Sequence, residues 1–154
     1  MPKIKGTITS LTEHEVEKSV RKYLINDKNR SIEKEEKKKW EHGCDIIARH
    51  SKWRKRLFIE AKWSWKHPEQ VKNNAFYTLL WQILSRMDIE GNNPKKARFY
   101  AIAIPADWEN TFRNKIKKMT YGWKLLKLKV YLVSKEWEDK YTVTEKSYSK
   151  LLKK

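Results

Sequence analysis

Two short apolar runs in the chain contain the charged residues best suited to chemistry. The run over residues 43–48, Gly-Cys-Asp-Ile-Ile-Ala, contains Asp45. The run over residues 57–62, Leu-Phe-Ile-Glu-Ala-Lys, contains Glu60 and Lys62. Apolar runs of this length on either side of a polar turn are typical of a buried β-hairpin. The sequence therefore predicts that these charged groups enter an apolar setting.

The predicted hairpin sets the spacing between the charged groups. A tight turn at Lys52-Trp53 pairs residues that lie symmetrically on its two sides. Asp45 then faces Glu60 across the hairpin, at the ~5 Å separation of cross-strand partners. Lys62 follows Glu60 by two residues and so points to the same face of the strand. We expect two carboxylates and one ammonium group at the open end of the hairpin.

Two carboxylates that face each other in an apolar setting are costly unless a partner compensates their charge. A divalent cation is the simplest such partner. Mg²⁺ prefers oxygen ligands, usually one or two carboxylates together with phosphate oxygens. The alternative is an ordinary ion pair between Glu60 and Lys62 on an exposed edge strand. The isoleucine, leucine and phenylalanine residues of the two runs favour burial over this alternative.

Asp45 followed by Glu60-Ala61-Lys62 resembles the signature of the PD-(D/E)xK nuclease superfamily, which includes restriction endonucleases, archaeal Holliday junction resolvases and Mrr-like enzymes. The resemblance implies an α/β fold of the restriction-endonuclease type, with a central mixed β-sheet flanked by helices. It implies Mg²⁺, with Mn²⁺ as a substitute, bound by Asp45, Glu60 and the backbone carbonyl of Ala61, and Lys62 near the attacking water. Cys44 replaces the signature's proline, a position that varies within the superfamily.

The predicted first helix begins with a capping box, in which Thr12 and Glu15 satisfy backbone amides of the first turn. Glu13 and Glu17 border its apolar stripe. The helix is similar to the Phe-Glu-x-x-Val-x-x-Leu-Leu pattern of Mrr-like enzymes, which implies Glu17 as an accessory catalytic acid. Glutamates at a helix start also simply favour the helix dipole, and the choice between Glu13 and Glu17 stays open. The stripe that should face the sheet is Val16, Val20, Tyr23 and Leu24.

A second long helix is predicted from Pro68 to about Met87. Gln82 and Arg86 lie at one edge of its apolar stripe, and a glutamine in so apolar a setting needs a hydrogen-bond partner. In the superfamily a glutamine on this helix often reaches the active site. The resemblance thus implies a supporting role for Gln82 and, less directly, for Arg86, against the alternative of a helix flank. The stripe is Phe76, Leu79, Leu80, Ile83, Leu84 and Met87.

Basic and aromatic residues flank the predicted site. Trp63 and Trp65 follow the motif and either stack on unpaired bases or pack at the rim. A zinc interpretation of His42, Cys44 and His50 fits no strong spacing pattern and lacks a fourth ligand. The densest basic cluster is the hairpin turn, which either grips a flanking phosphate or is simply solvated. Its basic residues are Lys52, Arg54, Lys55 and Arg56, and Arg86 of the second long helix is a further candidate for contact with nucleic acid.

Other elements complete the predicted fold. Residues 27–42 are mostly Lys and Glu and should contain a first, exposed edge strand. A buried strand over residues 99–104 precedes a helix that Asp107 should cap. Further strands are expected near residues 128–133 and 141–143, followed by a basic tail. The core order of helix, three strands, helix and strand, with a further helix and strand, covers residues 12–133 of a single domain over 1–154.

The composition of the chain indicates its partner and its compartment. The 154 residues carry a formal net charge of +17, from 36 Lys and Arg against 19 Asp and Glu. A thermophile-like surface explains many charges but not their sign, whereas nucleic acid is the commonest partner of such a surplus. One cysteine, no long apolar segment and no signal-peptide core predict a cytoplasmic protein outside the membrane.

These observations predict a metal-dependent nuclease that hydrolyses phosphodiester bonds of DNA. We expect an endonuclease that selects DNA structure, because no base-reading helix or zinc finger is recognisable. A non-catalytic nucleic-acid-binding module on the same fold is the main alternative, and a basic interaction domain is a third. The resemblance also includes homodimers, for which an exposed apolar patch on the last strand or on the 107–119 helix would be the signature.

Overall fold

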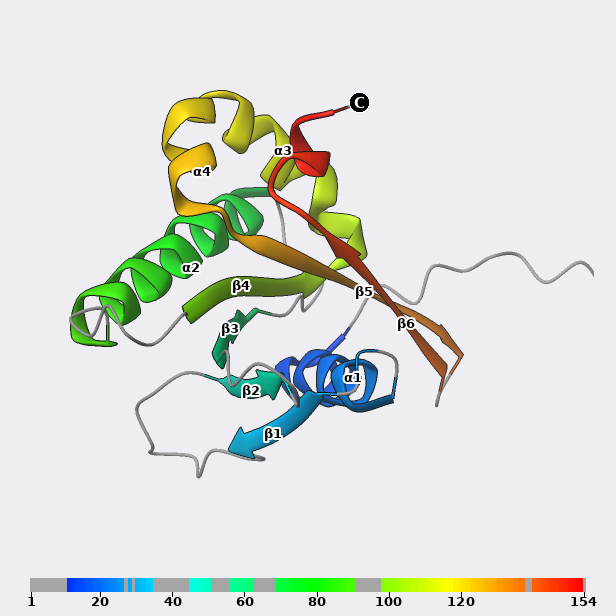
Figure 1. Ribbon diagram of the computed structural model, residues 1–154. Helices are drawn as coiled ribbons and strands as arrows, with labels where there is room; N and C mark the ends of the chain where they lie inside the picture. Colours follow the sequence, from blue (N-terminus) through cyan, green and yellow to red (C-terminus); the bar gives the residue numbers. More distant parts are fainter. Residues whose placement is uncertain are drawn as a thin grey trace, which may run out of the picture.

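The computed structural model describes residues 11–26, 28, 30–34, 45–50, 56–62, 69–90, 98–137 and 140–153. In these parts of the chain, a mixed β-sheet has helices on both faces (Figure 1), which confirms the predicted α/β fold. The helices are α1 (Glu13–Asn26), α2 (Glu69–Glu90), α3 (Glu109–Lys117) and α4 (Thr120–Leu126), with short 3-10 helices η1 (Ala106–Trp108) and η2 (Lys150–Leu152). The strands are β1 (Arg30–Lys34), β2 (Ile46–His50), β3 (Arg56–Ala61), β4 (Arg98–Pro105), β5 (Lys129–Trp137) and β6 (Lys140–Lys146).

The strands lie in the sheet in the order β1-β2-β3-β4-β5-β6. β1, β2 and β3 are antiparallel to one another, β4 and β5 continue parallel to β3, and β6 is antiparallel to β5. The predicted core order of helix, three strands, helix and strand is therefore confirmed. β1 is an edge strand within the charged segment where the sequence predicted one.

The sheet separates two apolar cores. α1 covers one face, where its buried residues pack against Leu57, Ile59 and Ala61 of β3. The helices α2, α3 and α4 cover the other face (Figure 1). Strands β3, β4 and β5 run through the middle and contribute alternate residues to the two cores, which is why they read as nearly continuous apolar runs. Charged groups at the end of β3 therefore lie between two helical layers.

The capping box fixes the start of α1 as predicted. The backbone N–H of Thr12 donates to Glu15 Oε2 at 2.8 Å, and the N–H of Glu15 donates to Thr12 Oγ1 at 3.1 Å. This reciprocal pair satisfies two amides that lack partners within the helix. Val16, Val20 and Leu24 are fully buried against the sheet, so the predicted apolar stripe is confirmed.

The helical layer on the other face departs from the predictions in two places. Leu84 of α2 is 44% exposed rather than part of the buried stripe, because the helix turns that flank toward solvent. Asp107 does not cap α3: the residue at the N-cap position is Trp108, whose side chain forms no capping hydrogen bond, and Asp107 lies within η1. The predicted stripe residues that are buried are Phe76, Leu79, Leu80 and Ile83.

Several large exposed apolar side chains lie on this same layer of helices. Tyr77 and Trp81 of α2 and Tyr121 and Leu125 of α4 are exposed, whereas Phe112 of α3 is buried. The strand β5 does end in an exposed residue, Trp137. Among the described helices, none is long and apolar enough to cross a membrane.

A polar clamp ties α1 to the far edge of the sheet. Glu15 Oε1 accepts hydrogen bonds from Lys135 Nζ and from the hydroxyl of Tyr141, both at 2.9 Å. Burial raises the pKa of Glu15, but the Thr12 amide and the Lys135 and Tyr141 side chains outweigh it and leave the pKa below its ordinary value. The clamp therefore needs the ionised carboxylate, and it fixes the rotation of α1 against β5 and β6.

Glu15→Gln should lower the stability of the protein at neutral pH by a few degrees in Tm. The folded-state pKa of Glu15 is depressed, so its contribution is present above the unfolded pKa and is lost as pH falls through the folded pKa. The difference in Tm between wild type and variant should shrink below pH ~4 and vanish once Glu15 is protonated in both states. Thermal melts across pH would measure it, with Asp107→Asn as an exposed control; a difference that persists at low pH would contradict the charge-based explanation.

Candidate functional site

The hairpin of β2 and β3 has the predicted register. Its pairs run from Ile46 with Ile59 to Arg49 with Arg56, symmetrically about the turn. Asp45 immediately precedes β2 and is only 6% exposed. Beyond the last backbone pair, a side chain extends the contact between the two strands: Asp45 Oδ2 accepts a hydrogen bond from the backbone N–H of Ala61 at 2.8 Å. This bond holds the Asp45 carboxylate against the end of β3.

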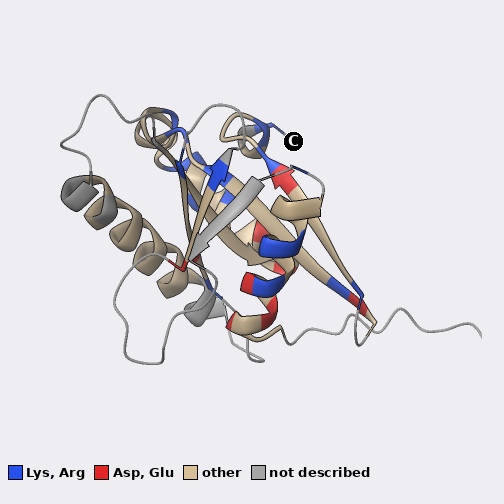
Figure 2. Ribbon diagram, turned by 60° about the horizontal axis from the view of Figure 1, so that its bottom comes forward, with Lys and Arg blue, Asp and Glu red and all other residues tan. Residues whose placement is uncertain are grey.

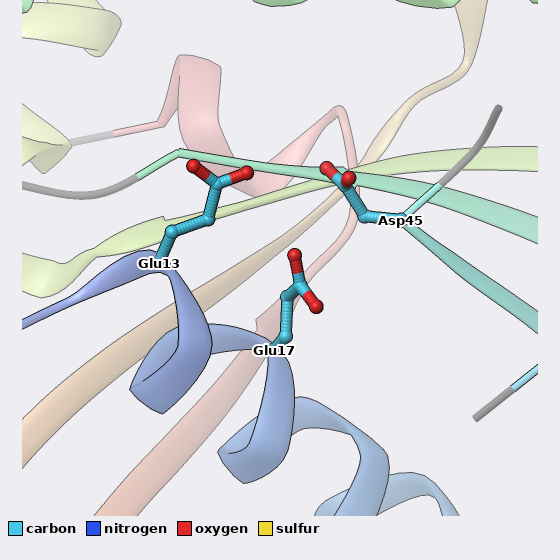
Figure 3. Close-up of side chains that lie close together, drawn as sticks. All are labelled: Glu13, Glu17 and Asp45. Atoms are coloured by element: carbon cyan, nitrogen blue, oxygen red, sulfur yellow. The ribbon is translucent and has the colours of Figure 1, made fainter. Parts of the chain in front are cut away.

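Two glutamates of α1 meet Asp45 at this point. Glu13 and Glu17 are one turn apart on the helix. One carboxylate oxygen from each of them and one from Asp45 all lie within 4.8 Å of one another. Figure 3 shows the three carboxyl groups converging from the helix and from the start of β2. Both Glu13 and Glu17 therefore belong to this carboxylate group, whereas the sequence left open which of the two is the accessory acid.

Arg21 completes this group, and the sequence analysis missed it. Its Nη2 lies 3.3 Å from Glu17 Oε2 and donates to the backbone carbonyl of Asp45 at 3.2 Å. The guanidinium therefore offsets part of the negative charge and links the helix to the strand. The spacing of Glu13, Glu17 and Arg21 at four-residue intervals was a usable signal, because it places all three on one flank of α1.

Glu60 and Lys62 occupy the end of β3 next to this carboxylate group. Glu60 is 1% exposed, and Lys62 is half-buried, with its backbone N–H donating to the carbonyl of Ala103 at 3.0 Å. Alternation along β3 places Glu60 on the face of Phe58, away from α1. Among the described residues, the group within 4.8 Å consists of the α1 glutamates and Asp45, without Glu60. A metal site that combines Glu60 and the Ala61 carbonyl with Asp45 stays a prediction.

Gln82 lies on α2, the helix that covers the Glu60 face of the sheet. The residue is partly buried, and its Oε1 is buried without a hydrogen-bond partner within the described part of the chain. A buried amide oxygen without a partner costs free energy, so this position on α2 offers an acceptor that a ligand, water or neighbouring group can satisfy. The proposed supporting role of Gln82 is compatible with this position.

Several predicted binding residues lie outside the described residues: Lys52, Arg54, Lys55, Trp63 and Trp65, together with the side chain of Arg86. The zinc candidates His42 and Cys44 also lie outside them. Arg56 is described and half-buried at the start of β3. Its guanidinium carbon lies 5.4 Å from the centre of the Phe58 ring. Arg56 is therefore partly engaged in packing at the end of the hairpin opposite Asp45.

Comparisons with known proteins found two solved structures of low similarity. No family model and no curated protein sequence match the chain. An XisH family protein from Nostoc punctiforme PCC 73102 superposes with a TM-score of 0.47 at 16% sequence identity, over 76% of this chain and 91% of that chain. An fdxN element excision controlling factor protein from Anabaena variabilis gives a TM-score of 0.47 at 17% identity, over 77% and 91%.

Proposed function

We propose that the protein is a metal-dependent nuclease that hydrolyses phosphodiester bonds of DNA. The observation that carries the proposal is the convergence of Glu13, Glu17 and Asp45 within 4.8 Å, beside the buried end of β3 that bears Glu60 and Lys62. The similarity of Asp45 and Glu60-Ala61-Lys62 to the PD-(D/E)xK signature supports the same assignment. No other cluster of three potential metal ligands occurs among the described residues.

The donor set suits a hard divalent cation. Three carboxylates so close together repel one another, and the Arg21 guanidinium beside Glu17 offsets part of that charge. Carboxylate oxygens are the ligands that Mg²⁺ and Mn²⁺ prefer. Asp45, Glu13 and Glu17 would hold the ion, with Glu60 and the Ala61 carbonyl as further candidates. When bound, such an ion lowers the pKa of a water and stabilises charge on the phosphate.

The residues around the carboxylates have separate tasks in this proposal. The Ala61 amide and Arg21 orient Asp45 through its side chain and its carbonyl. Lys62 positions the attacking water or stabilises the negative charge that develops on the phosphate. The net charge of +17 attracts the DNA backbone without regard to sequence, which favours an endonuclease that selects DNA structure. A cytoplasmic location belongs to the same proposal and follows from the single cysteine.

The test is cleavage of plasmid, linear, flapped and four-way DNA by wild type and by Lys62→Ala in Mg²⁺, Mn²⁺ and EDTA. We expect wild type to cut in either metal, EDTA to stop it, and the variant to be slower by on the order of 10²-fold. Lys124→Ala, an exposed lysine of α4, removes the same charge and should cut like wild type. Equal rates for wild type and Lys62→Ala would refute the assignment of Lys62.

A non-catalytic nucleic-acid-binding module is the second candidate. The observation that favours it is the position of Glu60 outside the group of converging carboxylates. Such a module would bind DNA tightly and with strong salt dependence, yet neither wild type nor Lys62→Ala would cut any of the four substrates. That outcome, with the protein shown to be folded, would replace the nuclease proposal.

A further inference from the structure

A cavity of about 560 Å³ lies between the later turns of α1 and the start of β6. Its volume falls within the ~300–1,000 Å³ that small-molecule sites occupy. Lys18 and Lys22 line it from α1, while Lys140 and Thr142 line it from β6. The cavity is separate from the group of Glu13, Glu17 and Asp45, none of which lines it.

The walls of the cavity favour an anion. Three of the lining residues are lysines, and no described residue that lines the cavity is acidic. Lys18 and Lys22 lie one helical turn apart, so their ammonium groups can act on the same ligand atoms. Acidic residues of α1 lie in its first turns and basic residues follow them, so the charge changes sign along the helix (Figure 2). Concentrated positive charge in a concave site raises the local concentration of anions.

Two tyrosines give the cavity aromatic walls as well as charge. The Tyr23 ring makes an edge-on contact with Tyr131, with centroids 6.0 Å apart, and the Tyr141 hydroxyl donates to Glu15. Both rings are therefore held in place before any ligand arrives. Rings fixed beside cations suit a planar base that is attached to a phosphate.

We propose that this cavity binds a nucleotide unit, with its phosphate ester held by Lys18, Lys22 and Lys140 and its base beside Tyr23 and Tyr141. A free nucleotide and one residue of a nucleic-acid strand offer this same chemistry. The preference for a strand rests on the proposed nuclease function. Because an α-helix is ~10–12 Å wide with its side chains, a strand of a few nucleotides can cross α1 and reach both the cavity and the carboxylates on the other flank.

Glu136 gives the proposal a distinctive consequence. Its carboxylate accepts the hydroxyl of Thr142 at 2.9 Å and pairs with Lys140 Nζ at 3.3 Å, so it occupies two groups that line the cavity. A phosphate that takes these groups must displace that carboxylate. Glu136→Gln removes the competing charge and should tighten ligand binding severalfold. If Glu136 instead only held the cavity in shape, the same substitution would weaken ligand binding.

The experiment measures binding in EDTA, so that no cleavage occurs. The probe is a fluorescein-labelled single-stranded DNA of about ten nucleotides, with 5′-AMP and inorganic phosphate as unlabelled competitors. The double variant Lys18→Ala/Lys22→Ala should bind the probe about tenfold more weakly than wild type. The control Lys117→Ala/Lys124→Ala removes the same charge from exposed positions on α3 and α4 and should change binding by no more than about threefold. Asn26→Trp fills the cavity without changing charge and should also weaken binding.

The outcomes separate the possible sources of the ligand. If 5′-AMP competes strongly with the probe in wild type but not in Asn26→Trp, the cavity is a site for a free nucleotide. If 5′-AMP competes weakly but the cavity variants bind the probe more weakly, the cavity is a site for a strand. Either supports the proposal. Equal weakening in the cavity and control double variants, with normal binding by Asn26→Trp, would overturn it. Equal competition by inorganic phosphate and 5′-AMP would overturn the role of the base.

This test and that of the nuclease activity can fail independently. Asp107→Asn lies outside both the cavity and the group of carboxylates and should bind the probe in EDTA at least as tightly as wild type. If the cavity variants lose binding but wild type never cuts DNA in any metal, the cavity stands and the nuclease proposal falls. If wild type cuts and the cavity variants bind and cut normally, only the cavity proposal falls.

Discussion

Asp45→Asn should reduce metal-dependent DNA cleavage by on the order of 10³-fold or more while leaving the protein folded. The substitution removes one of the three carboxylates that converge on the candidate metal site. A bound cation contributes several kcal/mol of transition-state stabilisation, and each 1.36 kcal/mol is tenfold in rate. The amide oxygen of asparagine can still accept the N–H of Ala61, which Asp45 Oδ2 accepts at 2.8 Å in wild type. The hairpin is therefore preserved while the charge is lost.

Asp45→Asn should change the thermal stability in the opposite direction to the activity. Without metal, the variant should melt at the same temperature as wild type or higher, because one source of repulsion among Glu13, Glu17 and residue 45 is gone. Ligands that bind only the folded state raise Tm by mass action, so Mg²⁺ should raise the Tm of wild type more than that of the variant. Cleavage kinetics and melts in EDTA and Mg²⁺ measure both effects. A variant that cuts at the wild-type rate, or that melts far lower in EDTA, would show that Asp45 serves structure rather than metal binding.

Trp123→Ala should lower the free energy of unfolding by about 3–5 kcal/mol, the cost of truncating a buried aromatic side chain. Trp123 of α4 is fully buried in the core under α2, α3 and α4. Its indole N–H also donates to the carbonyl of Tyr148 at 3.0 Å, which ties the helix to the segment before η2. The substitution leaves a large cavity and a carbonyl without its donor. Because small domains are stabilised by only ~5–15 kcal/mol, the variant should be close to unfolding.

Denaturant titration followed by circular dichroism measures this loss. Leu125→Ala on the same helix is the matched control, since Leu125 is 64% exposed and should change stability by less than ~0.5 kcal/mol. Trp123→Phe keeps most of the volume but not the hydrogen bond and should fall between the two. A loss below ~1 kcal/mol for Trp123→Ala would mean that α4 does not pack as described.

Local patterns in the sequence were sufficient to predict the elements that hold the candidate site. The capping box at Thr12 and Glu15 marked the start of α1, because the groups that satisfy the first amides of a helix are near neighbours in the chain. The hairpin register followed from the turn and from alternation, so the position of Asp45 against the end of β3 was predictable. The helix α4 was not predicted, because a seven-residue helix without a side-chain cap is too short for its apolar periodicity to be distinguished from that of a turn.

Only the tertiary structure decided which charged groups meet. Glu13 and Asp45 are far apart in the chain, and their convergence depends on how α1 is rotated against the sheet by the bonds from Glu15 to Lys135 and Tyr141. The same rotation creates the basic cavity beside β6. Patterns of period two and 3.6 report which face of an element is buried, but they carry no information about which distant element covers it. The sequence by itself therefore determined the helix, the hairpin and the residues capable of chemistry, and the packing of α1 across the sheet decided which of them share a site.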